Sequence, residues 1–136
     1  MAIKLTTTKE AAKVNGLKIG VCGLAGSGKT SLCGTVPNAV IISAESGLLS
    51  LRGLDIPVIE VGSIADVHEA YAFINESAEA KGFEWVCLDS ISEIAEQVLS
   101  HEKKINKDAR AAYGELSVQM VDLIKAFRDM PGKNVY

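Results

Sequence analysis

The eight residues GLAGSGKT, at positions 23–30, constrain this chain more than any other stretch of its sequence. They match the pattern G-x-x-x-x-G-K-[ST] at every fixed position, and an apolar run, LKIGVC, directly precedes them. Glycines let the backbone of such a loop turn its N–H groups onto phosphate oxygens at the start of a helix. The stretch therefore predicts a strand, a phosphate-binding loop (P-loop) and a helix in succession.

The side chains of this loop have distinct predicted roles. Lys29 is expected to reach the β- and γ-phosphates of ATP and to assist catalysis, and the Thr30 hydroxyl is expected to ligand Mg²⁺. The predicted nucleotide-binding residues of the loop are Gly23, Leu24, Ala25, Gly26, Ser27, Gly28, Lys29, Thr30 and Ser31.

Short apolar runs alternate with amphipathic stretches, which is typical of an α/β domain around a mostly parallel sheet. The expected strands are 17–22, 39–44, 57–61, 84–89 and 133–136. The expected helices are 28–35, 65–80, 91–104 and 112–129, where apolar residues recur every three or four positions. Residues 1–136 are predicted to form one domain with an N-terminal arm, 1–16. Because the chain stops barely into its last strand, we expect a longer protein.

Composition excludes several classes of protein. The net charge of −3 disfavours a protein that coats nucleic acid through bulk positive charge. No apolar run approaches the roughly 20 residues that cross a bilayer, and no secretory signal is present, so we expect a soluble, cytoplasmic protein with no membrane partner. The three cysteines lack a C-x-x-C pair and are expected to be small core residues.

A nucleotide site also needs a carboxylate for the magnesium ion, and FEWVCLDS (83–90) supplies one. Asp89 follows an apolar strand candidate and is predicted to take part in binding Mg²⁺. The alternative is that Asp89 or Ser90 caps the next helix. Sixty residues separate Lys29 from Asp89, with two strand candidates between them. This spacing favours the branch of P-loop enzymes that inserts a strand between the two motif strands.

Glu45 is the candidate carboxylate for activating water. It ends the second strand candidate in AVIISAESGLL, beside the predicted P-loop, where it can polarise a water for in-line attack on the γ-phosphate. The alternative is that Glu45 only caps the turn that follows. Asp89 does not begin the GTPase motif D-x-x-G, and the motif N-K-x-D is absent, which disfavours a GTPase. The chain has only three arginines, whereas a small-molecule kinase usually has several in its lid, which disfavours a kinase.

Together these residues resemble RecA/RadA-type recombinases and, more narrowly, the phage-encoded RecA-like P-loop ATPases of the single-strand annealing group, often called phage AAA-type nucleotide-binding proteins. The stretches that carry the resemblance are GLAGSGKTSL, VIISAESGLLSLR, DIPVIEV, LDSISEIAE, NKDARAAYGEL and AFRDMPGK. They span roughly residues 17–135. The resemblance implies a RecA-like core in which the strand from Lys133 lies between the strands bearing Cys22 and Asp89. A sensor residue and a second DNA loop would lie beyond Tyr136.

Two further hypotheses follow from position in that fold. Arg52 is a candidate for stacking on adenine, or an exposed residue at a helix end. The segment HEKKINKDAR (101–110) is a candidate DNA-facing loop, or a solvated helix end. Its candidate DNA or interface residues are Lys103, Lys104, Lys107 and Arg110, the last of which can also reach the γ-phosphate of a neighbouring subunit.

The sequence therefore predicts an ATP-hydrolysing protein that binds single-stranded DNA for homologous recombination or strand annealing. The expected partners are single-stranded DNA, further copies of the chain in a ring or filament, and a single-strand-binding protein. Two alternatives stay open: a phage accessory module that holds nucleotide with little turnover, and a small-molecule kinase. A phage origin would place the protein in the cytoplasm of the host cell.

Overall fold

A computed structural model describes residues 2–45 and 47–136 of the chain. Its centre is a sheet of four parallel strands in the order β2-β1-β3-β4. The strands are β1 (Ala39–Ser43), β2 (Val58–Glu60), β3 (Trp85–Asp89) and β4 (Asn134–Val135). The predicted α/β class with a mostly parallel sheet is confirmed, and it is that of a P-loop NTPase core.

The segment before the P-loop pairs with β4 at one edge of this sheet. The predicted strand 17–22 is reduced to a single parallel bridge between Lys18 and Val135. Hydrogen bonds of 2.8 Å run from the Ile19 N–H to the Val135 carbonyl and from the Val135 N–H to the Leu17 carbonyl. The segment from β4 onward nevertheless lies between the P-loop segment and β3, as the resemblance implied.

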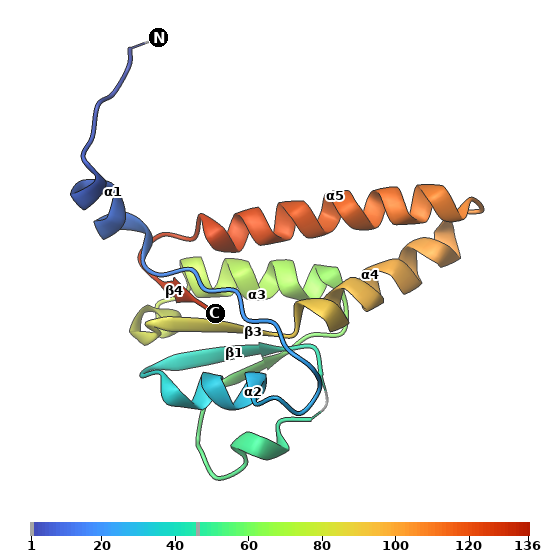
Figure 1. The fold of residues 1–136 in the computed structure, drawn as a ribbon, viewed down its shortest axis with the longest axis horizontal. Coiled ribbons are helices and arrows are strands. Elements are labelled where there is room, and N and C mark those ends of the chain that lie inside the picture. The colour runs from blue at the N-terminus through green and yellow to red at the C-terminus, as the bar shows by residue number, and fades with distance from the viewer. Residues whose placement is uncertain (1, 46) are drawn as a thin grey trace.

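Helices cover both faces of the sheet. The α-helices are α1 (Thr8–Asn15), α2 (Lys29–Leu32), α3 (Ile64–Glu76), α4 (Ile91–Ile105) and α5 (Ala109–Arg128), and short 3₁₀ turns are η1 (Cys33–Thr35), η2 (Leu49–Leu51) and η3 (Glu79–Gly82). Figure 1 shows α3, α4 and α5 over one face, α2 over the other, and α1 projecting with the N-terminal arm. Among the helices in the described part of the chain, none combines the length and apolar character that a membrane span requires.

Apolar side chains of the strands fill a core on each face. All five residues of β1 are buried, as expected of a central parallel strand. Val40 and Ile42 contribute to the core under α3, α4 and α5, whereas Ile41 packs with Cys33 and Cys87 on the face covered by α2. The expectation that all three cysteines are core residues is wrong for Cys22, which is exposed because its segment lies at the open edge of the sheet.

The predicted apolar stripes of the helices are largely buried. The buried members are Val67, Ala70 and Ile74 of α3, Ile94 and Val98 of α4, and Met120, Leu123 and Phe127 of α5. Three apolar residues that share this spacing in the predicted helices are exposed instead: Ala78, Ile91 and Ile124. Ala78 lies outside α3, which ends at Glu76, and Ile91 is the first residue of α4.

Several element boundaries differ from the predicted ones. The helix predicted at 28–35 is α-helical only over α2 and continues as η1. Helix α5 begins at Ala109 rather than at residue 112, because the Asp108 carboxylate accepts the N–H of Arg110 and caps it. Helix α1 was not predicted; it begins with a capping box in which Thr7 and Glu10 satisfy each other's backbone N–H groups.

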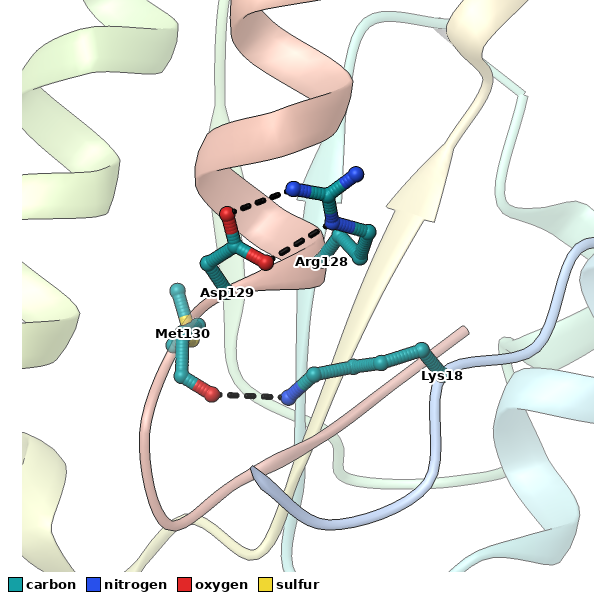
Figure 2. A network of polar contacts seen from close by, with 4 residues as sticks. All are labelled: Lys18, Arg128, Asp129 and Met130. Atoms are coloured by element: carbon teal, nitrogen blue, oxygen red, sulfur yellow. Dashed lines mark hydrogen bonds and ion pairs between the residues drawn. The ribbon is translucent and has the colours of Figure 1, made fainter. Parts of the chain in front are cut away.

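A lysine links the P-loop segment to the end of α5. The Lys18 ammonium donates to the carbonyl of Met130 at 2.8 Å (Figure 2) and to that of Lys133 at 2.6 Å. Burial lowers the pKa of Lys18, although the nearby Asp129 opposes that change. The Arg128–Asp129 ion pair beside it is solvent-exposed, so it contributes little to stability. Lys18 therefore helps to hold the edge segment in register with β4.

The first prediction separates two residues that the sequence placed on one stripe of α5. Phe127 is 2% exposed, and its ring lies edge-to-face 5.1 Å from Tyr71, whereas Ile124 is 47% exposed. We expect Phe127→Ala to lower the free energy of unfolding by roughly 3–5 kcal/mol. The matched variant Ile124→Ala should cost less than about 1 kcal/mol. Urea denaturation measures both, and equal losses would contradict the packing of α5.

Candidate functional site

The predicted P-loop lies at the carboxyl end of the sheet and borders a cavity of about 470 Å³. The lining residues come from the loop, from the ends of β1 and β3, and from the start of α4. They are Gly23, Ala25, Gly26, Gly28, Lys29, Thr30, Ser31, Glu45, Ser50, Asp89, Ser90 and Ser92. A larger hollow of about 640 Å³ lies between α3 and α4, but Lys104 is the only predicted site residue in its lining.

The backbone of the loop has the conformation that its glycines were expected to allow. Gly26 (φ +76°) and Gly28 (φ +90°) lie in the left-handed region, which other residues adopt at a cost. Gly28 is also the N-cap of α2, and the Ser27 N–H donates to the carbonyl of Leu24 at 3.2 Å. The loop thus turns sharply at the edge of the cavity and leads directly into α2.

Lys29 lies over the loop that it follows. Its ammonium donates to the carbonyls of Gly23 and Leu24, both at 2.8 Å, and approaches the Ser27 hydroxyl at 3.5 Å. Tyr136 also contacts this residue: its hydroxyl donates to the backbone carbonyl of Lys29 at 2.7 Å. The Lys29 ammonium is therefore held against the P-loop at the edge of the cavity. The sequence predicts that phosphate groups bind there.

Thr30 and Asp89, the two residues predicted to bind Mg²⁺, lie in contact. The Thr30 hydroxyl donates to the Asp89 carboxylate at 3.0 Å. Asp89 ends β3 directly beside Ser43 of β1 and is only 7% exposed. Burial raises the pKa of Asp89, as does the negative charge of Glu45, whereas the Thr30 hydroxyl and the Lys29 ammonium lower it. The net shift is upward, so the ionised carboxylate is held at a cost.

Glu45 lies across the cavity from the loop, just beyond the end of β1. Its carboxylate accepts a hydrogen bond of 2.6 Å from the Ser90 hydroxyl. The same hydroxyl accepts the N–H of Glu93 at 3.3 Å and so caps α4, as one interpretation of the sequence proposed. Glu45 therefore does not merely cap the turn after β1: its side chain reaches the segment that follows Asp89.

These residues fit ATP with Mg²⁺. The P-loop offers a turn with the required left-handed glycines and a lysine, and a hydroxyl and a nearly buried carboxylate lie 3.0 Å apart beside it. Mg²⁺ is usually bound by one or two protein oxygens together with phosphates and waters rather than by a protein cage. No group of three or more His, Cys, Asp or Glu that could hold a metal ion comes together in residues 2–45 and 47–136. Thr30 and Asp89 are the residues that would hold the ion.

The other predicted residues lie outside the cavity. Arg52 is exposed at the end of η2, and Ser50 of the same turn lines the cavity instead. The basic residues Lys103, Lys104, Lys107 and Arg110 are exposed around the turn between α4 and α5. The Lys103 ammonium lies 5.4 Å from the centre of the Tyr113 ring, within range of a cation–π interaction. Binding roles for Arg52 and for the basic residues stay predictions.

A family model described as an AAA domain matches residues 15–136, nearly the whole chain. The chain belongs to the AAA domain family. AAA domains are nucleotide-binding P-loop domains, which agrees with the loop and the Thr30–Asp89 pair. No curated protein and no solved structure matches the chain.

Sequence reasoning missed some residues of this AAA domain's cavity. Ser50 and Ser92 line it, and the Tyr136 hydroxyl supports Lys29. No sequence signal singles out the two serines, because serine is common at helix starts and in turns. Tyr136 directly follows β4, which lies between the P-loop segment and β3. That place in the sheet was the sequence signal that could have put Tyr136 beside the loop.

The second prediction concerns the cost of keeping Asp89 ionised. Because the folded-state pKa of Asp89 is raised, its ionisation destabilises the fold as pH rises above its unfolded value of about 3.9. The penalty grows as pH rises from the unfolded pKa of Asp89 through its raised folded-state pKa. We therefore expect Asp89→Asn, in EDTA, to raise the melting temperature at pH 7 and to change it less at pH 4. The amide oxygen can still accept the Thr30 hydroxyl.

Thermal unfolding of Asp55→Asn, at an exposed aspartate, provides the matched control. It should leave the melting temperature nearly unchanged at both pH values. An Asp89→Asn variant that is less stable than the native chain at pH 7 would show that the carboxylate is not under strain.

Proposed function

We propose that the chain is an ATP-hydrolysing, single-stranded-DNA-binding protein of the RecA/RadA-like, phage single-strand annealing type, working in homologous recombination or strand annealing. The observation that carries the proposal is the position of Glu45. It lines the P-loop cavity together with Lys29, Thr30 and Asp89, although Asp89 lies 44 to 60 positions along the chain from the other three.

Each side chain has a role in hydrolysis. Glu45 orients a water and accepts its proton as the water oxygen attacks the γ-phosphorus and the bond to ADP breaks. Lys29 and the loop N–H groups stabilise the negative charge on the phosphate oxygens. Thr30 and Asp89 would hold Mg²⁺, which would supply further positive charge at the phosphates. None of the three arginines lines the cavity, which is why we prefer hydrolysis to a kinase reaction.

The basic segment around the α4–α5 turn supports binding to single-stranded DNA. Its four cations are exposed, and Lys103 lies against the exposed ring of Tyr113. Cations beside aromatic rings suit a strand whose phosphates and bases are both accessible. The net charge of −3 means that this binding must be local, through one loop repeated along an assembly.

In this proposal ATP acts mainly as an assembly switch. Subunits form a ring or filament on single-stranded DNA, so that complementary strands can meet, and Arg110 of one copy reaches toward the nucleotide of the next. A single-strand-binding protein is the proposed recruiting partner. The proposed location is the cytoplasm, that of the host cell if the protein is phage-encoded.

The third prediction tests nucleotide-dependent DNA binding. Fluorescence anisotropy of a labelled oligo-dT should rise on addition of the protein with ATP and Mg²⁺, and should rise much less without nucleotide. Lys29→Ala should abolish the nucleotide-dependent part, because it removes the charge that holds the phosphates. ATP binding and release of phosphate are measured on the same samples. Binding of nucleotide without turnover would favour an accessory module, and phosphate on a small acceptor would favour a kinase.

Salt dependence locates the DNA contact within the same experiment. The double variant Lys103→Gln/Lys107→Gln should reduce the slope of log K against log salt by roughly 1.4, about 0.7 for each phosphate contact that is lost. Lys81→Gln/Lys125→Gln is the matched control, because both lysines are exposed and lie outside the basic segment. Equal effects of the two double variants would exclude the α4–α5 turn as the DNA site.

A further inference from the structure

We propose that Ser90 is a positioning residue for hydrolysis, whose hydroxyl fixes the Glu45 carboxylate and joins it to helix α4. This inference rests on the proposed role of Glu45 in activating water.

The hydroxyl of Ser90 makes two contacts at once. It donates to Oε1 of Glu45 at 2.6 Å and accepts the N–H of Glu93 at 3.3 Å. A serine hydroxyl has one proton and two lone pairs, so both bonds form together and the single proton is committed to Glu45. A distance of 2.6 Å is typical of a hydroxyl that donates to an ionised carboxylate, which is a strong type of hydrogen bond.

The backbone on either side of this contact is already fixed. The Ser43 hydroxyl, almost fully buried, donates to the carbonyl of Glu45 at 2.8 Å. The Ala44 N–H donates to the carbonyl of Asp89 at 2.9 Å, which holds the ends of β1 and β3 together. The freedom that remains is rotation about the bonds of the Glu45 side chain. Because this side chain is exposed, packing does little to restrain it. The hydrogen bond from Ser90 provides that restraint.

The position of the bond also suits catalysis. Ser90 donates to Oε1 of Glu45, and within residues 2–45 and 47–136 no hydrogen bond to Oε2 is formed, so Oε2 can accept a proton from water. Without Ser90 the carboxylate can rotate among several conformers, and a misplacement of about 1 Å in an active site can cost 100-fold in rate. We therefore expect Ser90 to affect the rate of hydrolysis and not the affinity for nucleotide.

Because Ser90 also caps α4, the test must separate the loss of a cap from the loss of the Glu45 contact. Ser63 is the matched control: its hydroxyl caps α3 through the N–H of Asp66 at 3.2 Å and does not contact Glu45. Ser90→Ala should lower kcat roughly 10- to 100-fold while the dissociation constant for ATP stays within about twofold. Ser63→Ala should leave kcat unchanged, and Ser90→Thr, which keeps the hydroxyl, should restore most of the rate.

A double-mutant cycle with Glu45→Gln decides whether the effect passes through the carboxylate. If Ser90 acts by positioning Glu45, adding Ser90→Ala to Glu45→Gln should lower kcat no further. Rate losses that multiply would overturn the proposal, as would a Ser90→Ala variant with a native kcat. If the native chain binds ATP and releases no phosphate, the proposed hydrolysis fails and this inference fails with it. Native turnover with a fully active Ser90→Ala variant would overturn the inference alone.

Discussion

The hydrogen bond of 3.0 Å between Thr30 and Asp89 joins two parts of the chain that are far apart in sequence. It holds the first turn of α2, and with it the P-loop, against the end of β3. Asp89 is nearly buried, and its raised pKa shows that the fold keeps an ionised carboxylate there at a cost. Lys29, Glu45 and Ser90 are arranged around this contact, so the geometry of the whole cavity depends on it.

Much of the fold and the centre of the site could be predicted from the sequence. The glycines of the loop need particular backbone angles, and buried parallel strands need continuous apolar runs, so both leave clear patterns. In a parallel sheet the carboxyl ends of strands meet at one edge, which is why Glu45 and Asp89 could be assigned to one site with Lys29. The family match supports the nucleotide-binding assignment at the same coarse level.

Other features depend on contacts that no local pattern encodes. The segment before the P-loop makes a single bridge to β4 instead of the predicted strand. Ile124 fits an apolar stripe of α5 but is 47% exposed. Arg52 lies outside the cavity because η2 turns Ser50 toward it instead. Ser90 and Glu45 lie 45 positions apart, and nothing in the sequence indicates that they are in contact.

Helix α1, in contrast, could have been predicted from the sequence, since its capping box is visible as T-x-x-E at Thr7 and Glu10.

We infer that Thr30 and Asp89 together hold Mg²⁺ for a nucleotide on the P-loop. The most direct test is calorimetric titration with ATP, in the presence of Mg²⁺ and in EDTA, for the native chain, Thr30→Ser and Thr30→Val. The account predicts that Mg²⁺ tightens ATP binding at least about tenfold, or roughly 1.4 kcal/mol, in the native chain and in Thr30→Ser, and that Thr30→Val loses this gain. An affinity for ATP that does not depend on Mg²⁺, or a gain that survives in Thr30→Val, would contradict it.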